Sequence, residues 1–178
     1  HVDELDTPVL TLDLDALEDN LDRYQRYYDQ HGIGLRPHIK THKTLAVAHM
    51  QMARGAIGLT CQKLGEAEVM VNGGIDQDIL LPYNILGKQK LDRLMALAQR
   101  TQRLTVSADS AYTINGLSDA ASRAGVTLGV VVELEIPPGY AGTCPTDRPR
   151  TGPRIARDYG LSHQPCGPSS IARDAEPL

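Results

Sequence analysis

The spacing of hydrophobic positions alternates between two patterns along residues 6–133. In five stretches apolar residues recur at every third or fourth position, which is the spacing of one face of an α-helix. Short apolar runs lie between these stretches and are typical of buried strands. The predicted helices cover residues 14–31, 41 or 44 to 54, 62–71, 88–103 and 110–124. The predicted strands cover residues 6–12, 32–36, 56–61, 78–81, 104–107 and 126–133.

Residues that favour helix ends flank these stretches. Asp13 is placed to cap the first predicted helix, and Asp109 or Ser110 is placed to cap the fifth. Gly32 and Gly125 follow the same two helices, where glycine commonly ends a helix. The end signals therefore agree with the hydrophobic spacing about where these helices lie.

Strand and helix alternate along the chain, which predicts repeated βα units around a parallel sheet, an α/β fold. Right-handed crossovers turn such a series into either a barrel or a doubly wound sheet, and the pattern leaves both open. A nucleotide-binding sheet would favour a G-x-G-x-x-G or G-x-x-x-x-G-K-[ST] loop after its first strand. Neither motif is present there, which argues against nucleotide binding.

Composition narrows the class of protein. The chain has 178 residues, 41% hydrophobic and 22% charged, which suits one globular domain. A net charge of −4 argues against a nucleic-acid partner, and no apolar run is long enough to span a membrane. The start of the sequence has no signal-peptide pattern. Three cysteines without metal spacing predict a reducing, cytoplasmic location and no disulfides.

The composition changes abruptly after residue 135. Residues 136–178 hold eight of the eleven prolines and contain neither lysine nor valine. Proline at this density interrupts helices and central strands, so we expect an irregular tail after an ordered part over residues 1–135. Our hypothesis is that this tail is an out-of-frame or otherwise aberrant continuation of a truncated gene, which sequencing of the encoding DNA would test.

The stretch with the clearest chemistry is Leu-Arg-Pro-His-Ile-Lys-Thr-His-Lys over residues 35–43. Lys40 follows a predicted strand, and ligands of parallel α/β folds bind beyond the carboxyl ends of the strands. A lysine amine attacks a carbonyl when burial or nearby positive charge lowers its pKa. Arg36, Lys43 and protonated His38 or His42 would supply such charge. The alternative is a basic surface turn that binds a phosphate or nothing.

Four segments together resemble one family. They are residues 7–20 (TPVLTLDLDALEDN), 36–43 (RPHIKTHK), 60–68 (TCQKLGEAE) and 78–84 (DILLPYN). In order and spacing they are similar to the D-threonine aldolase and D-serine dehydratase group of pyridoxal 5′-phosphate enzymes, which are related to alanine racemase and have fold type III. The resemblance implies a (β/α)₈ TIM barrel, of which about five of the eight units are present here. Its strands would begin near Ile33, Ala56, Asp78, Leu104 and Val126.

The resemblance also implies the roles of individual residues. Lys40 would carry the cofactor and act in catalysis, while the cofactor serves as an electron sink. The further cofactor-binding candidates are His38, Arg36, His42 and Gln62. The substrate-binding candidates, which follow the next strand, are Tyr83 and Asn84. For the histidines the alternative is simple hydrogen bonding, and for Gln62 it is satisfying backbone groups at a helix start. Cys61 is expected to pack in the core.

The implied reaction is D-threonine aldolase-like cleavage of a D-β-hydroxy amino acid to glycine and an aldehyde. The alternatives are D-serine dehydratase-like elimination, a non-catalytic pyridoxal-phosphate-binding protein, and an inactive fragment of such an enzyme. The family also uses a divalent metal bound near its carboxyl end, and that site is expected to be absent here. His163 and Cys166 are only two ligands, so no metal site is predicted. The open edge of an incomplete sheet leaves a homodimer as an expectation.

Overall fold

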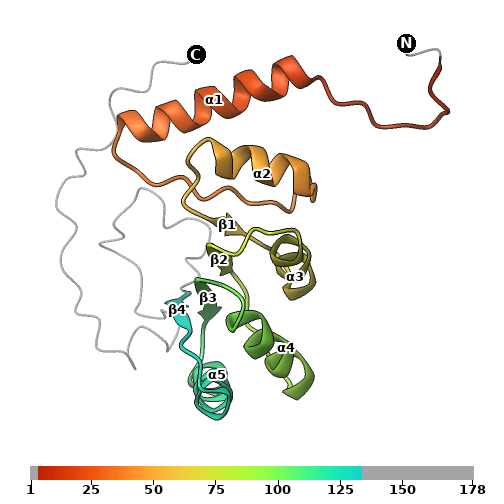
Figure 1. Ribbon diagram of the computed structural model, residues 1–178. Coiled ribbons are helices and arrows are strands. Elements are labelled where there is room, and N and C mark those ends of the chain that lie inside the picture. Colours follow the sequence, from red (N-terminus) through yellow and green to blue (C-terminus); the bar gives the residue numbers. More distant parts are fainter. Residues whose placement is uncertain (1–3, 134–178) are drawn as a thin grey trace, which may run out of the picture. The chain divides into compact units, whose positions relative to one another are not determined.

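A computed structural model describes residues 4–133 of the chain, which form an α/β unit (Figure 1). Helices and strands alternate after the first two helices. In chain order the elements are α1 (Leu14–Gln30), α2 (Leu45–Ala53), β1 (Leu59–Thr60), α3 (Leu64–Asn72), β2 (Asp78–Leu81), α4 (Lys88–Ala98), β3 (Arg103–Ala108), α5 (Ala111–Ala124) and β4 (Gly129–Val132). The order confirms the predicted α/β alternation.

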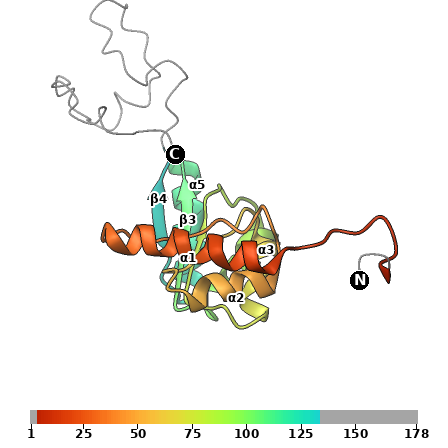
Figure 2. The same ribbon diagram turned by 90° about the horizontal axis from the view of Figure 1, so that it is seen from above.

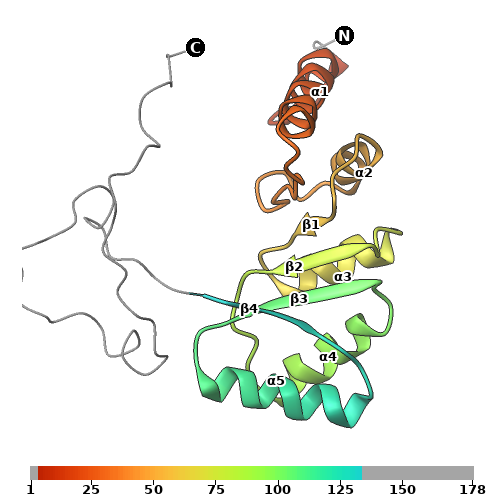
Figure 3. The same ribbon diagram turned by 90° about the vertical axis from the view of Figure 1, so that its left-hand side faces the viewer.

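The four strands form one parallel sheet in the order β1-β2-β3-β4 (Figure 3). The register places Thr60, Leu80, Thr105 and Gly129 in one row across the sheet. A single parallel bridge between His38 and Thr60 extends this row by one position beyond β1. The carboxyl ends of the strands therefore meet at one edge, as expected for consecutive βα units.

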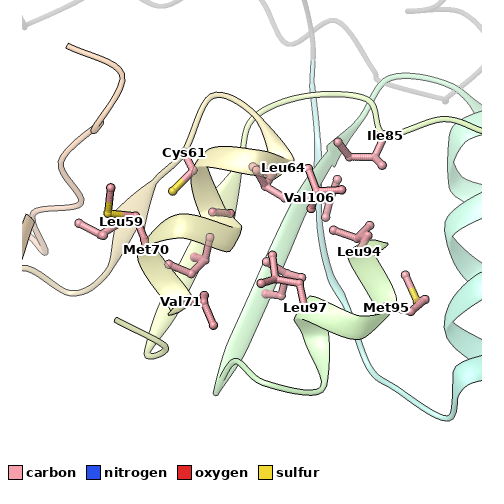
Figure 4. Close-up of a cluster of buried hydrophobic side chains, with 14 of the residues drawn as sticks. Leu59, Cys61, Leu64, Met70, Val71, Ile85, Leu94, Met95, Leu97 and Val106 are labelled. Atoms are coloured by element: carbon pink, nitrogen blue, oxygen red, sulfur yellow. The ribbon is translucent and has the colours of Figure 1, made fainter. Parts of the chain in front are cut away.

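Helices α3, α4 and α5 cover one face of the sheet (Figure 1). Ile79 and Leu81 point to this face and are fully buried, whereas Leu80 between them lies on the other face and is half-buried. Figure 4 shows how the strand and helix side chains meet in this core. Burial of each such leucine or isoleucine contributes about 2 kcal/mol to stability. This layer fixes the sheet edge that carries the polar residues.

The predicted start of α1 and the two predicted ends of α5 are confirmed. The Asp13 carboxylate accepts a hydrogen bond from the Ala16 backbone N–H at 3.0 Å. Ser110, rather than Asp109, caps α5, since its hydroxyl accepts from the Thr113 N–H. Gly125 ends α5 with a φ of 66°, a left-handed conformation that glycine adopts at low cost.

Helix α1 packs less tightly than the other helices. It lies beside α2 (Figures 1 and 2), where Asp22 of α1 pairs with Arg54 at the end of α2. Two of the hydrophobic residues that recur at helical spacing in α1, Leu14 and Tyr24, are exposed. The residue of α1 that is buried is Gln25, which donates to Asp29.

Two predicted strands are wrong. Residues 6–12 are exposed and form no strand, because no neighbouring strand pairs with them within residues 4–133. Residues 32–36 also form no strand, and this part of the chain contributes only the bridge at His38. A strand requires a paired neighbour along its length, and here the pairing lasts for one position.

Some predicted boundaries also move. Helix α3 begins at Leu64 instead of residue 62, and α4 ends at Ala98. Arg103, predicted to close that helix, is instead the first residue of β3, where it pairs with Asp78 of β2. The predicted tail over residues 136–178, with His163 and Cys166, lies outside the described residues. Among residues 4–133, no helix combines the length and apolar character needed to cross a membrane.

Candidate functional site

Lys40 lies at the carboxyl-end edge of the sheet, two residues past the bridge between His38 and Thr60. The chain is held on both sides of that bridge: Thr60 N–H donates to Pro37 O at 2.8 Å, and Ile39 N–H donates to Thr60 O at 3.0 Å. Although residues 32–36 are not a strand, this pairing delivers Lys40 to the predicted edge. The position agrees with where ligands bind in parallel α/β folds.

A tight turn presents the Lys40 side chain. Lys43 N–H donates to Ile39 O at 2.8 Å and closes the turn, and Lys43 itself has a φ of 50°. Such left-handed backbone is uncommon outside glycine and occurs often at functional sites. Ile39 anchors the turn because its side chain is fully buried, whereas Lys40 is exposed. Within residues 4–133 the Lys40 amine has no ion pair or hydrogen bond.

His38 connects the turn to the next loop. Its Nδ1 accepts a hydrogen bond from the Lys40 backbone N–H at 3.2 Å. Its Nε2 lies 2.9 Å from Oε1 of Gln62, which comes directly before α3. The structure therefore brings three of the predicted site residues into one contact chain.

Glu66 holds the other side of this loop. One carboxylate oxygen accepts from the Gln62 backbone N–H at 2.9 Å, and the other lies 3.9 Å from Lys43 Nζ. The backbone N–H of Gln62 is bonded at a helix start, and its side chain reaches His38. Its contact with the cofactor stays a prediction. Glu66 was missed as a site residue, although its position four residues after Gln62 on a helix was the available signal.

His42 is held in the same manner as His38. Its Nδ1 accepts from the Thr44 backbone N–H at 3.0 Å, at the start of α2. Burial lowers the pKa of His42, and the nearby Gln51 side chain opposes that shift. Nε2 of His42 and Oε1 of Gln51 are both buried, and neither has a hydrogen-bond partner among residues 4–133. Gln51 was not predicted as a site residue.

Arg36 lies at the opposite edge of the sheet from Lys40. Its guanidinium forms two hydrogen bonds with the Asp78 carboxylate, at 2.6 and 2.8 Å, at the start of β2. Arg103 lies 3.9 Å from the same carboxylate. This pairing holds Arg36 away from the Lys40 edge, and its contact with the cofactor stays a prediction. Lys43 pairs with Glu66 as well. Arg36 and Lys43, two of the cations expected to act on the Lys40 amine, are therefore each paired with a carboxylate.

Tyr83 and Asn84 follow β2 at the same edge as Lys40. The Tyr83 side chain is 37% exposed, and Oδ1 of Asn84 accepts from the Asp109 backbone N–H at 3.3 Å. Asn84 thus ties the loop after β2 to the loop after β3. The two residues lie at the expected edge, and within residues 4–133 neither forms a side-chain hydrogen bond with His38 or Lys40.

Cys61 lies directly after β1 and is fully buried in the core, as expected. Burial raises the pKa of its thiol to about 12, and the negative charge of Glu66 adds to that shift. A thiol in this state is a poor nucleophile and a poor metal ligand, because both roles need the thiolate. The side chain therefore serves packing.

A family model for the N-terminal domain of alanine racemase matches residues 12–163. The chain belongs to this alanine racemase N-terminal domain family. The family is dependent on pyridoxal 5′-phosphate. The matched range extends past residue 135, and the hypothesis that residues 136–178 are aberrant sequence stays a prediction.

Relatives within the family are enzymes named for D-amino acids. The chain is 41% identical over 138 residues to D-threonine aldolase of Arthrobacter sp, covering 78% of this chain and 36% of the relative. It is 39% identical over 140 residues to 3-hydroxy-D-aspartate aldolase of Paracoccus denitrificans, with the same two coverages. D-threo-3-hydroxyaspartate dehydratase of Delftia sp. (strain HT23) is 32% identical over 145 residues, covering 82% and 38%.

A solved structure gives the same result for the fold. The crystal structure of D-threonine aldolase from Filomicrobium marinum matches with a TM-score of 0.72 and 45% identity, over 77% of this chain and 37% of that one. The family and this match confirm the prediction that the α/β unit is part of a TIM barrel. The chain spans little more than a third of the length of these relatives.

The residues at the Lys40 edge suit the aldehyde end of pyridoxal phosphate. The amine that attacks a carbonyl carbon must be accessible and free of other partners. The Lys40 amine is exposed and has no partner among residues 4–133. Its neighbours His38 and Gln62 are polar groups already bonded to each other, so neither competes for the amine. Within residues 4–133 no three histidine, cysteine or acidic side chains converge to hold a metal ion.

Proposed function

We propose that this chain is the cofactor-lysine part of a pyridoxal-phosphate lyase that acts on D-amino acids, with D-threonine aldolase-like cleavage as its reaction. One observation carries the proposal: Lys40 is an exposed amine, without a partner among residues 4–133, on an anchored turn at the carboxyl-end edge of a parallel sheet. Family membership and the names of the relatives support the cofactor and the substrate class.

Lys40 would hold the cofactor, with His38, Gln62 and His42 keeping its backbone in place. When bound, pyridoxal phosphate supplies an electron sink for charge that develops at the α-carbon of the substrate. The Lys40 amine would also be a candidate to accept and return a proton near that carbon. Tyr83 and Asn84 lie at the same edge and are the described candidates for substrate contact.

Aldol cleavage and dehydration differ in the bond that breaks. In cleavage of D-threonine the bond between the α- and β-carbons breaks, the β-hydroxyl loses its proton, and the products are glycine and acetaldehyde. In dehydration the β-hydroxyl leaves with a proton from the α-carbon as water, and hydrolysis then gives ammonia and a 2-oxo acid. The Delftia relative favours dehydration as the second candidate. The higher identity of the two aldolases favours cleavage.

Three further expectations remain proposals. The divalent metal of the family would bind outside residues 4–133. Homodimer formation would involve the open edge at β4, where Val130, Val131 and Val132 are exposed. The cytoplasmic location rests on cysteine usage alone.

The test is a product assay with the full chain and pyridoxal phosphate, using D-threonine and D-3-hydroxyaspartate. Lys40→Ala is the control. Aldehyde and glycine that depend on Lys40 would support cleavage, while a 2-oxo acid and ammonia that depend on Lys40 would transfer the proposal to dehydration. Cofactor binding through Lys40 without turnover would identify a non-catalytic binding protein or an inactive fragment. Absence of both binding and turnover would overturn the proposed function for this chain.

A further inference from the structure

His38 and His42 repeat one arrangement four residues apart. In each, Nδ1 accepts the backbone N–H of the second residue after it: Lys40 for His38 and Thr44 for His42. Nε2 of His38 also faces the side-chain oxygen of Gln62, in the loop before α3, at 2.9 Å. Nε2 of His42 is buried and has no hydrogen-bond partner within residues 4–133.

These contacts determine which ring nitrogen carries the proton. A backbone N–H can only donate, so Nδ1 of His38 and of His42 must be an unprotonated acceptor. A neutral ring then carries its single proton on Nε2, and in His38 this nitrogen donates to Oε1 of Gln62. A protonated ring would carry a second proton on Nδ1, directed at the backbone N–H. The contacts are therefore consistent with only one form of each ring.

The two backbone N–H groups enclose the Lys40 turn. One belongs to Lys40 itself, and the other belongs to Thr44, the residue that begins α2. The turn between them is closed by the bond from Lys43 N–H to Ile39 O. Both ends of the turn are thus bonded to a histidine ring, and His38 is in turn bonded to Gln62 on a different segment, while the Lys40 amine is left exposed.

We propose that His38, through its pair with Gln62, and His42 are positioning residues. Both are held as neutral Nε2–H tautomers by the backbone N–H groups that they accept, and they thereby fix the Lys40 turn. Neither histidine then acts as an acid, a base or a cofactor ligand. The claim about the tautomers stands independently of the cofactor, and only its consequence for Lys40 rests on the proposed function.

Glutamine suits this role because its oxygen accepts a hydrogen bond without carrying charge. A carboxylate in its place would favour the doubly protonated ring, and that ring cannot accept the backbone N–H. A leucine would remove the acceptor and leave the Nε2 proton without its partner. The choice of side chain therefore makes the proposal testable by single substitutions.

The first experiment reads the tautomers directly. The full chain is labelled with ¹⁵N in histidine, and its ring nitrogens are observed by NMR without cofactor at about pH 8, above the usual histidine pKa of about 6.5. Single substitutions of each histidine assign the signals. His31 is an internal reference for a protonated Nδ1, since its Nδ1 lies 2.7 Å from the Tyr27 carbonyl oxygen and must donate to it.

The expected spectrum shows unprotonated Nδ1 and protonated Nε2 for His38 and His42, with protonated Nδ1 favoured in His31. A protonated Nδ1, or an even mixture of tautomers, in His38 or His42 would overturn the proposal. This outcome does not depend on whether the chain binds pyridoxal phosphate. Failure of the positioning role is thereby distinguished from failure of the proposed function.

The second experiment links the pair to Lys40. Gln62→Leu is expected to change the His38 signals, to leave the His42 signals unchanged, and to slow capture of pyridoxal phosphate by Lys40 about fivefold. Gln89→Leu, on the exposed face of α4, is the matched control and should leave both readouts unchanged. Unchanged His38 signals in a folded Gln62→Leu variant would contradict the assigned pair. Altered signals with unchanged capture would contradict the positioning role.

Discussion

The Arg36 guanidinium forms two hydrogen bonds with the Asp78 carboxylate, and Gly58, directly before β1, lies against the backbone of Asp78. Arg36 and Asp78 are separated by 42 positions in the sequence, and both side chains are largely buried. The pair lies at the amino-terminal edge of the sheet, whereas Lys40 lies at the other edge. Stability and chemistry are thus assigned to opposite ends of the same strands, as is common in βα barrels.

Replacing Arg36 with Met should lower the free energy of unfolding by about 2–3 kcal/mol, because it leaves a mostly buried carboxylate with only the more distant Arg103. Urea denaturation measures the loss. The matched control is Lys88→Met, which breaks an exposed pair with Asp92 and should cost less than about 0.5 kcal/mol. Equal effects of the two substitutions would contradict the structural role of Arg36. Cofactor capture by Lys40 should persist in the folded Arg36→Met variant.

The close approach of Gly58 to Asp78 predicts a second stability effect. A Cβ at position 58 would lie 2.2 Å from the backbone oxygen of Asp78, so Gly58→Ala must push β1 away from β2. The expected loss is about 3 kcal/mol or more, measured by urea denaturation. Gly65→Ala is the control: its Cβ would meet only an Arg93 nitrogen at 3.9 Å, and alanine in α3 should stabilise by about 0.5–1 kcal/mol. A tolerated Gly58→Ala would mean that the strands are not packed as described.

The raised pKa of Cys61 predicts an unreactive thiol. With a pKa of about 12, almost no thiolate exists at pH 8, and burial also blocks access. Iodoacetamide should leave Cys61 unmodified in the native chain and modify it in denaturant. Peptide mass spectrometry makes the comparison on the same residue, so the denatured sample is the control. Rapid native alkylation at Cys61 would place it outside the core.

The lowered pKa of His42 predicts a stability that depends on pH. Burial disfavours its charged form in the folded chain, so the unfolded chain binds more protons below its usual pKa of about 6.5. Stability should therefore fall as pH decreases from about 6.5 through the lower folded pKa, and this residue adds no pH dependence at higher pH. Denaturation at a series of pH values should show a smaller acid loss for His42→Gln than for wild type. A difference that is the same at every pH would contradict this assignment.

Residues close together in the sequence were sufficient to predict where α1 begins and where α5 begins and ends. Asp13, Ser110 and Gly125 act through their own hydrogen bonds or backbone angles, so neighbouring residues in the sequence carry the information. The predicted strand at residues 32–36 failed because strand formation depends on a partner far along the chain. The pairing there is limited to the bridge at His38.

The site was predictable in position but not in its contacts. The motif around Lys40 and the order of βα units located the lysine at a strand end. The contacts of His38 with Gln62 and of Arg36 with Asp78 join segments that only the fold brings together. Sequence spacing therefore identified the residue types and could not assign Arg36 to the opposite edge.

The most direct test of the account is to trap the cofactor on the chain and locate it. Pyridoxal 5′-phosphate is added, the adduct is reduced with borohydride, and the modified lysine is identified by peptide mass spectrometry. The nearby Lys43, paired with Glu66, and Lys63, at the start of α3, are the controls within the same sample. The account predicts that the modification is concentrated at Lys40. Rapid labelling of the chain should be lost in Lys40→Ala and retained in Lys63→Ala. Equal labelling of all three lysines would contradict a built cofactor site at Lys40.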